Sequence, residues 1–247
     1  MKKELVVISH SGGLDSSTLF LKALNEGHTV LPITYKYGQA NFIENYAQVL
    51  VTENYKTKFP GQILDTMSID FTESIGSVVD TFKKNRDNGK MEEHNDLKYY
   101  MPSRNLLFMA TAAVIGEIIA IDESYDTIHL GLGIHQHSDI YARDYWDISE
   151  EFANRLQLLM QLNDNVKVDI YAPYKNFMKS KIVSDAIEMD VPLQLTWTCY
   201  EPRIVSSAHN NTYIPCQECE ACQERQTQAD NVQTGLDINN YHIVVEH

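Results

Sequence analysis

Two short stretches of the sequence concentrate residue types that could do chemistry. The first, SGGLDS at 11–16, directly follows an apolar run at 4–9. Small residues let backbone N–H groups approach an anion closely, and a helix that starts here would add its positive end. The stretch therefore predicts a phosphate-binding loop, against the alternative of a plain polar turn. The residues expected to hold the phosphate are Ser9, Ser11, Gly12, Gly13, Leu14, Asp15, Ser16 and Ser17.

Asp15 differs from its neighbours because a carboxylate does not bind a bare phosphate. It can order the loop or hold a magnesium ion. The stretch does not match the G-x-x-x-x-G-K-S/T loop of nucleotide-dependent phosphoryl transfer, so that chemistry is not indicated.

The second stretch lies near the C-terminus and holds every cysteine of the chain. Four thiolates satisfy a tetrahedral zinc ion and leave no coordination position open, which predicts a structural metal site. A redox pair would leave two cysteines unexplained, and spacing alone does not separate zinc from an iron–sulfur cluster or from unligated thiols. The expected ligands are Cys199, Cys216, Cys219 and Cys222.

Alternating strands and helices must position these stretches. Hydrophobic patterns predict strands at 4–9, 29–34, 61–67, 126–132 and 166–171, and helices at 16–24, 41–59, 103–121, 149–162 and 178–189. The helix at 103–121 is strongly apolar and is expected to be buried, with Ser103 as its N-cap. Such alternation implies parallel strands with helices on both faces, an α/β fold. The charged stretch 83–99 is expected to be a solvated loop, and YHIVVEH at 241–247 a late strand.

The composition of the chain indicates which classes of binding partner to expect. The chain of 247 residues carries a formal net charge of −14. That balance disfavours a broad grip on nucleic acid, which requires Lys and Arg against the phosphates. No apolar run reaches the ~20 residues of a membrane span, and the run after Lys3 lacks the cleavage pattern of a signal peptide. We expect a cytoplasmic protein without nucleic-acid or membrane partners.

Five further motifs carry a family resemblance when they are taken in order with the loop. They are YGQ (37–39), MPSRN (101–105), PYKNFMKSKIV (173–183), TWTCYE (196–201) and PCQECEACQER (215–225). Together they resemble the 7-cyano-7-deazaguanine synthases, in the PP-loop superfamily of N-type ATP pyrophosphatases. The resemblance implies a Rossmann-like domain (adenine nucleotide alpha hydrolase-like) at 1–190, a zinc-binding region at 191–247, and a homodimer. It also implies ATP, Mg²⁺ and Zn²⁺.

The resemblance further implies an ATP-dependent ligase of queuosine-type biosynthesis. Such an enzyme converts 7-carboxy-7-deazaguanine and ammonia to 7-cyano-7-deazaguanine through adenylated intermediates. Arg104, Lys179 and Asp15 match catalytic positions; without the resemblance, Arg104 and Lys179 would be interpreted as ordinary residues at helix starts. The residues implied to lie near the substrate are Tyr37, Gln39, Asn105 and Asp147.

Several positions depart from the family pattern. Ser103 stands where the family usually has glycine, His10 stands at a commonly apolar position, and YWDIS at 145–149 replaces YPDCR and keeps Asp147. Two alternatives therefore stay open: a related ligase that amidates or conjugates a different carboxylate, and a nucleotide-binding module without catalysis. A base thiolase is disfavoured because no cysteine remains outside the expected zinc set. His135 and His137 form an H-x-H pattern that is more typical of hydrogen-bonded or exposed histidines than of metal ligands.

Overall fold

A parallel sheet forms the centre of the molecule, in a computed structural model that describes residues 3–37, 43–85, 101–136, 146–233 and 235–246. Its five strands lie in the order β3-β2-β1-β4-β5. They are β1 (Glu4–Ser9), β2 (Thr29–Lys36), β3 (Met67–Asp70), β4 (Thr127–Gly131) and β5 (Lys167–Tyr171). Strand order reverses beside β1, so the loops that follow β1 and β4 diverge there. In open α/β sheets this is where ligands bind.

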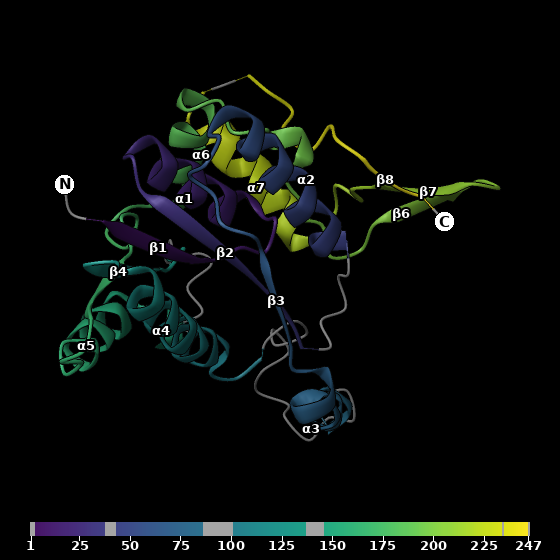
Figure 1. Cartoon of the computed structure of the whole chain (residues 1–247). Coiled ribbons are helices and arrows are strands. Elements are labelled where there is room, and N and C mark those ends of the chain that lie inside the picture. Colours follow the sequence, from purple (N-terminus) through teal and green to yellow (C-terminus); the bar gives the residue numbers. More distant parts are fainter. Residues whose placement is uncertain (1–2, 38–42, 86–100, 137–145, 234, 247) are drawn as a thin grey trace.

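Helices cover both faces of this sheet (Figure 1). One face packs against α1 (Leu14–Asn25), α2 (Ile43–Lys58) and α6 (Lys179–Glu188), and the other against α4 (Arg104–Glu123) and α5 (Glu150–Met160). Another helix, α3 (Thr72–Asn85), follows β3. The expected α/β architecture with helices on both faces is confirmed.

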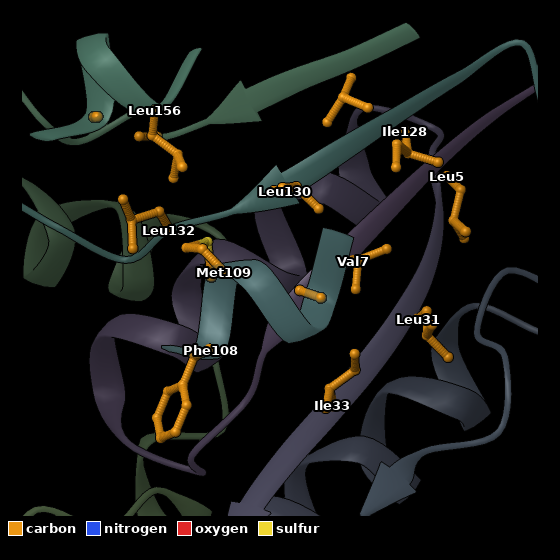
Figure 2. Packing of buried hydrophobic residues seen from close by; sticks show 14 of the residues in the cluster. Leu5, Val7, Leu31, Ile33, Phe108, Met109, Ile128, Leu130, Leu132 and Leu156 are labelled. Carbon is orange, nitrogen blue, oxygen red and sulfur yellow. The ribbon is translucent and has the colours of Figure 1, made fainter. Parts of the chain in front are cut away.

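The central strand β1 shows why its sequence is apolar throughout. Leu5 and Val7 point toward α4 and α5, where Figure 2 shows them among residues such as Phe108 and Leu130. Val6 and Ile8 point the other way, into the cluster under α1 and α6. A parallel strand buried on both faces has no solvent side, so alternation disappears from its sequence.

Helix α4 is less buried than its composition predicts. Phe108, Met109 and Ala112 pack on the sheet, but Val114 and Ile118 on the other flank are 59% and 60% exposed. The helix is long and apolar enough to pass a test for a membrane span, although its inner stripe packs against β1 and β4 as a core helix does. The expectation of a buried helix therefore holds only for its inner stripe.

The strand expected at 61–67 also differs. Ile63 makes a single bridge to Val30, and regular pairing with β2 begins only at Met67. A turn with Gly61 at φ 80° precedes the bridge, and the chain leaves the sheet before it returns as β3. Of the charged stretch 83–99, residues 83–85 end α3, and the rest lies outside the described residues.

The C-terminal part contains elements that the sequence did not predict. A short 3₁₀ helix (Leu193–Leu195) precedes the hairpin of β6 (Arg203–Ser206) and β7 (Asn210–Ile214), and α7 (Glu220–Asn231) follows. Helix α7 was missed because its buried residues include Cys222, Arg225 and Gln228 and so give no apolar period. The expected late strand is β8 (Ile243–Glu246), which pairs with β7. The division at residue 190 stays a prediction.

Candidate functional site

The predicted phosphate loop lies where the sheet topology requires it, between the carboxyl end of β1 and the start of α1. Gly12 has a φ of 78°, a conformation that side-chain-bearing residues rarely adopt. A Cβ atom on Gly12 would lie 2.4 Å from the backbone nitrogen of Gln48 and 2.7 Å from the carbonyl oxygen of Glu44. Glycine is therefore required here because the first turn of α2 packs directly on the loop.

The loop leaves the positive end of α1 open. The N-cap residue is Gly13, which has no side chain to bond the N–H groups of the first turn. Two hydroxyls line the same turn: Ser11 Oγ accepts from the Gly13 N–H at 3.2 Å and lies 3.2 Å from Ser16 Oγ. Free helix-start amides with hydroxyls beside them are the elements of an anion site.

Beneath the loop lies a buried histidine. His10 is 1% exposed, and its ring nitrogens lie 3.3 Å from Ser17 Oγ and 3.4 Å from Thr52 Oγ1. Burial lowers the pKa of His10 to about 3, so the ring is neutral at physiological pH. This residue stands where the family usually has an apolar one, and it joins α1 to α2 through two hydroxyls.

Lys179 extends from the first position of α6 toward the loop. Its Nζ lies 2.9 Å from Glu224 Oε2 and 3.5 Å from Asp15 Oδ2. Burial works against the charged ammonium, but the two carboxylates together raise the pKa of Lys179. The other oxygen of Asp15, Oδ1, is buried without a hydrogen-bond partner among the described residues. We call Lys179, Asp15 and Glu224 the Lys179 side of the site.

Arg104 reaches the site from the first position of α4. Burial disfavours its charge, but hydrogen bonding to Tyr37 and the charge of Glu44 raise the pKa of Arg104. Burial also raises the pKa of Glu44 to about 7, and Arg104 partly offsets that effect. We call Arg104, Tyr37 and Glu44 the Arg104 side of the site.

Tyr200 connects the two sides. Burial is the main cause that raises the pKa of its hydroxyl to about 12, and Glu44, Lys179 and Arg104 all act on it. The two cations predicted from motifs far apart in the sequence therefore both act electrostatically on one tyrosine, three residues after Trp197, whose backbone N–H bonds the loop. Sequence reasoning missed Glu44, Tyr200 and Glu224 as site residues. Tyr200 and Glu224 lie inside quoted motifs, whereas nothing in the sequence marked Glu44.

Two of the residues implied to lie near the substrate contact each other. Asp147 is 3% exposed, and its Oδ2 accepts from the backbone N–H of Asn105 at 2.9 Å. The Asn105 side-chain amide donates to the Asp147 carbonyl oxygen at 3.0 Å. Asp147 thus bonds the first turn of α4, next to Arg104. The role of both residues toward a substrate stays a prediction.

Ser103 is the N-cap residue of α4 as expected, but its side chain does not cap the helix. Ser103 occupies the N-cap position but has a φ of 57° and makes no side-chain bond to the helix. In this left-handed conformation its hydroxyl does not serve the first turn, and the carboxylate of Asp147 bonds that turn instead. Glycine adopts this conformation at little cost, whereas a serine does not.

The other candidate residues lie near these groups or outside the described residues. Ser9 ends β1, Leu14 is buried, and Tyr37 follows β2 beside the ring of Phe108. Gln39 and His137 lie outside the described residues. His135 is 9% exposed and its Nδ1 lies 2.9 Å from the Gln136 carbonyl oxygen, as expected of a hydrogen-bonded histidine.

The four cysteines come together as the sequence predicts. Their Sγ atoms all lie within 4.8 Å of one another, the separation that one tetrahedral ion would bridge. Hydrogen bonding from the Cys222 thiol is the main cause that lowers the pKa of Cys199 to about 5. The same hydrogen bond raises the pKa of Cys222, so the metal-site assignment rests on the four converging sulfur atoms.

A short segment joins the cysteine cluster to the loop. The backbone N–H of Trp197 donates to the Gly12 carbonyl oxygen at 2.9 Å, and the Trp197 indole donates to the Cys199 carbonyl oxygen at 2.8 Å. Arg225 is fully buried behind the segment and donates to Thr198 Oγ1 at 2.9 Å. Trp197, which stands two residues before the first of the four cysteines, therefore supports the loop.

Fold and site together define a class. A glycine-containing anion loop after the first strand of a 3-2-1-4-5 parallel sheet is the arrangement of Rossmann-like, PP-loop nucleotide-binding folds. The chain belongs to the family described as "Queuosine biosynthesis protein QueC", whose family model matches residues 4–233. This confirms the family expected from the motifs.

Curated relatives match over nearly their whole length. A 7-cyano-7-deazaguanine synthase from Pseudoalteromonas translucida is 30% identical over 220 residues, which cover 89% of this chain and 91% of the relative. The 7-cyano-7-deazaguanine synthase 2 from Colwellia psychrerythraea is 31% identical over 233 residues and covers 93% and 96%. A solved structure, the U34-tRNA thiolase NcsA from Methanococcus maripaludis, aligns over 96% of this chain and 68% of its own, with 12% identity and a TM-score of 0.43.

Proposed function

We propose that this chain is an ATP-dependent ligase that converts 7-carboxy-7-deazaguanine and ammonia to 7-cyano-7-deazaguanine. The product is the one for which the curated relatives are named, and the substrates and the use of ATP are part of the proposal. The observation that carries the proposal is the loop itself, where the uncapped start of α1 and the hydroxyls of Ser11 and Ser16 lie together and Lys179 Nζ lies 3.5 Å from Asp15 Oδ2. Free helix-start amides, hydroxyls and a cation suit a substrate with several phosphates.

The chemistry explains why ATP is required. A carboxylate is a poor acceptor for ammonia because its leaving group would be oxide. Transfer of AMP from ATP to a carboxylate oxygen releases pyrophosphate and gives an acyl adenylate. Ammonia attacks its carbon, AMP leaves, one proton is lost, and the amide forms. Adenylation of the amide oxygen by a further ATP, followed by loss of AMP and the remaining N–H protons, gives the nitrile.

The residues fit this sequence of steps. The open start of α1 and the hydroxyls of Ser11 and Ser16 would hold the pyrophosphate portion of ATP. Asp15 has a buried carboxylate oxygen that no described residue hydrogen-bonds, which suits a ligand for Mg²⁺. Magnesium would supply charge neutralisation between phosphate oxygens. Arg104 would offset the negative charge that develops at the α-phosphate.

Glu44 suits the handling of ammonia. Its pKa of about 7 lets it exist as a base in part of the population at neutral pH, and it lies beside Arg104. Ammonium must lose a proton before it can attack a carbonyl carbon. We assign Glu44 as the group that accepts this proton.

The cysteine cluster would hold zinc as a structural ion. Four thiolates fill a tetrahedral shell and leave no position for a substrate. Through Trp197, the ion would fix the segment that bonds the loop at Gly12. An iron–sulfur cluster remains the other candidate for the same ligands, and metal analysis of anaerobically and aerobically purified protein separates the two.

A homodimer is supported by exposed apolar residues on α4, on α5 and just after α5. Figure 1 shows the two helices on the same side of the sheet. Bonds from Asn163 and Asn165 to Glu117 tie the end of α5 to α4. The exposed residues are Val114, Ile118, Ile121, Leu158 and Leu162, at 59% to 76% exposure. Light scattering should give a dimer that Ile118→Glu converts to monomer, while Val205→Glu on β6 leaves it intact.

The decisive experiment uses zinc-loaded protein with ATP, magnesium, ammonium and 7-carboxy-7-deazaguanine, and follows the base by mass spectrometry. Nitrile together with AMP is expected. Accumulation of the amide would place this chain among ligases that stop after one activation. No AMP from folded protein, with ATP still bound, would favour a nucleotide-binding module. Lys181→Ala, an exposed lysine on α6, is the matched control for changes at Lys179.

A further inference from the structure

A second group of side chains that could ligate a metal lies on the middle strands of the central sheet, toward the ends opposite the phosphate loop. Glu4 starts β1, His28 directly precedes β2, and His129 lies in the middle of β4. One ligand atom from each residue lies within 4.8 Å of the others. These three positions are scattered through the sequence, and the parallel pairing of β1 with both neighbours brings them together.

Their side chains share one face of the sheet. Val6 pairs with both Val30 and His129, so His129 points to the same side as Val6, under α1 and α6. Glu4 is two residues before Val6, and His28 is two before Val30, so the period of two puts them on that face as well. The phosphate loop begins after Ser9, about 16 Å away at ~3.3 Å per residue. The group is therefore separate from the proposed active site.

The atoms are spaced as ligands of one ion. Glu4 Oε2 lies 3.1 Å from His129 Nε2 and 3.5 Å from His28 Nδ1. Two ligands bound at ~2.1 Å with a tetrahedral angle stand about 3.4 Å apart. Both imidazoles thus direct a nitrogen toward the same carboxylate oxygen at close to the required separation. Two imidazoles and a carboxylate form a ligand set for divalent first-row transition metals.

A carboxylate lies near the other ring nitrogen of His28, beyond hydrogen-bond length. The other nitrogen of His28, Nε2, lies 3.8 Å from Glu26 Oε2, and Tyr171 donates to the same oxygen at 2.7 Å. Lys22 pairs with the other oxygen of Glu26 at 2.9 Å. A metal-bound histidine commonly directs its free N–H to a carboxylate.

The group is accessible to an ion from solution. The side chains of His129, His28 and Glu4 are 17%, 19% and 32% exposed. We propose that Glu4, His28 and His129 bind a divalent transition-metal ion such as Zn²⁺, with Glu26 orienting His28. The ion would clamp β1, β2 and β4 together at their amino-terminal part, away from the chemistry.

Calorimetric titration tests the site in the full chain. Protein whose cysteine site already carries zinc is titrated with Zn²⁺, and one further equivalent is expected to bind with micromolar or tighter affinity. His28→Gln and His129→Gln should each weaken this step by at least ~10-fold, and Glu26→Gln by about 10-fold. His209→Gln removes an exposed histidine elsewhere and should change nothing.

A second measurement keeps the test independent of folding in the variants. With the cysteine site filled by zinc, added Co²⁺ should give d–d absorption without thiolate charge transfer, and the melting temperature of the wild type should rise with the ion. No further equivalent in the wild type would overturn the proposal. Equal binding by wild type and a folded His28→Gln/His129→Gln double variant would overturn it too.

Discussion

The Lys179 side and the Arg104 side of the site differ in how their cations are held. Lys179 lies between two carboxylates, Asp15 and Glu224, and Glu224 belongs to the helix that also carries Cys222. Arg104 faces a tyrosine hydroxyl and Glu44, whose pKa of about 7 leaves it partly neutral. The charge of Lys179 is neutralised by two carboxylates that also hold the side chain in place. The charge of Arg104 is less fully neutralised and is available to a ligand. We infer that Lys179 organises the site and that Arg104 stabilises the reacting phosphate.

The largest effect is expected when the anchor of the Lys179 side is removed. Cys216→Ser, or removal of the metal by a strong chelator, should abolish activity, because the segment through Trp197 would lose its connection to the loop. ATP binding measured by calorimetry should fall in parallel with metal content. Full ATP affinity in metal-free, folded protein would break the proposed link between cluster and loop.

Arg104→Ala should lower kcat by about 10²- to 10³-fold with little change in melting temperature, since an interaction made mainly in the transition state is lost. Arg104→Lys should retain part of the rate, because the charge remains but the planar fork does not. Steady-state kinetics on AMP release measures both. Arg155→Ala, an exposed arginine on α5, is the control. A change confined to KM would assign Arg104 to ground-state binding.

Lys179→Ala should behave differently from Arg104→Ala. It leaves Asp15 and Glu224 without their shared cation, so we expect KM for ATP to rise about 10- to 100-fold and the melting temperature to fall. A double variant with Glu224→Gln should recover part of the melting temperature. If Lys179→Ala matched Arg104→Ala in both kinetics and melting, the distinction between the two sides would be wrong.

His10 joins the helix that carries Asp15 to the helix that carries Glu44, and so links the two sides of the site. Its pKa is about 3 in the folded chain and 6.5 as the ordinary value, so the unfolded chain binds more protons between these values. Stability is therefore lost as pH falls below 6.5. Between pH 6.5 and 5, the free energy of unfolding should drop about 1.5 kcal/mol more in the wild type than in His10→Gln. Urea denaturation at both pH values measures this, and parallel pH curves would contradict it.

The smallest effect concerns the start of α4. Ser103 has a φ of 57°, which glycine adopts more easily, so Ser103→Gly should raise the free energy of unfolding by up to ~1 kcal/mol. The gain is reduced by the greater freedom of glycine in the unfolded chain. Thermal melts of Ser103→Gly and Ser103→Ala give the answer: alanine should stabilise less than glycine, and the reverse order would remove strain as the explanation.

The sequence was most informative where local chemistry and local structure coincide. The SGGLDS loop, the four cysteines, Arg104 and Lys179 were found from motifs, and the strands at β1, β4 and β5 from apolar runs. Glu44 was missed because its role depends on α2 packing against the loop, which no local pattern encodes. Helix α7 was missed because a buried arginine and cysteine replaced its apolar stripe. The pair Glu4 and His129 depends on strand order alone.

The bond from Trp197 to Gly12 also sets an order of assembly. The loop is made near the beginning of the chain, but the group that fixes its carbonyl oxygen is made near the end. Closing so long a stretch of chain has an entropic cost, and we expect this contact to form late in folding. A nascent chain that has already formed the central strands would thus hold an incomplete loop until the cysteines emerge. Availability of the metal would then decide not only how stable the finished protein is, but when a newly made molecule first becomes able to bind its nucleotide.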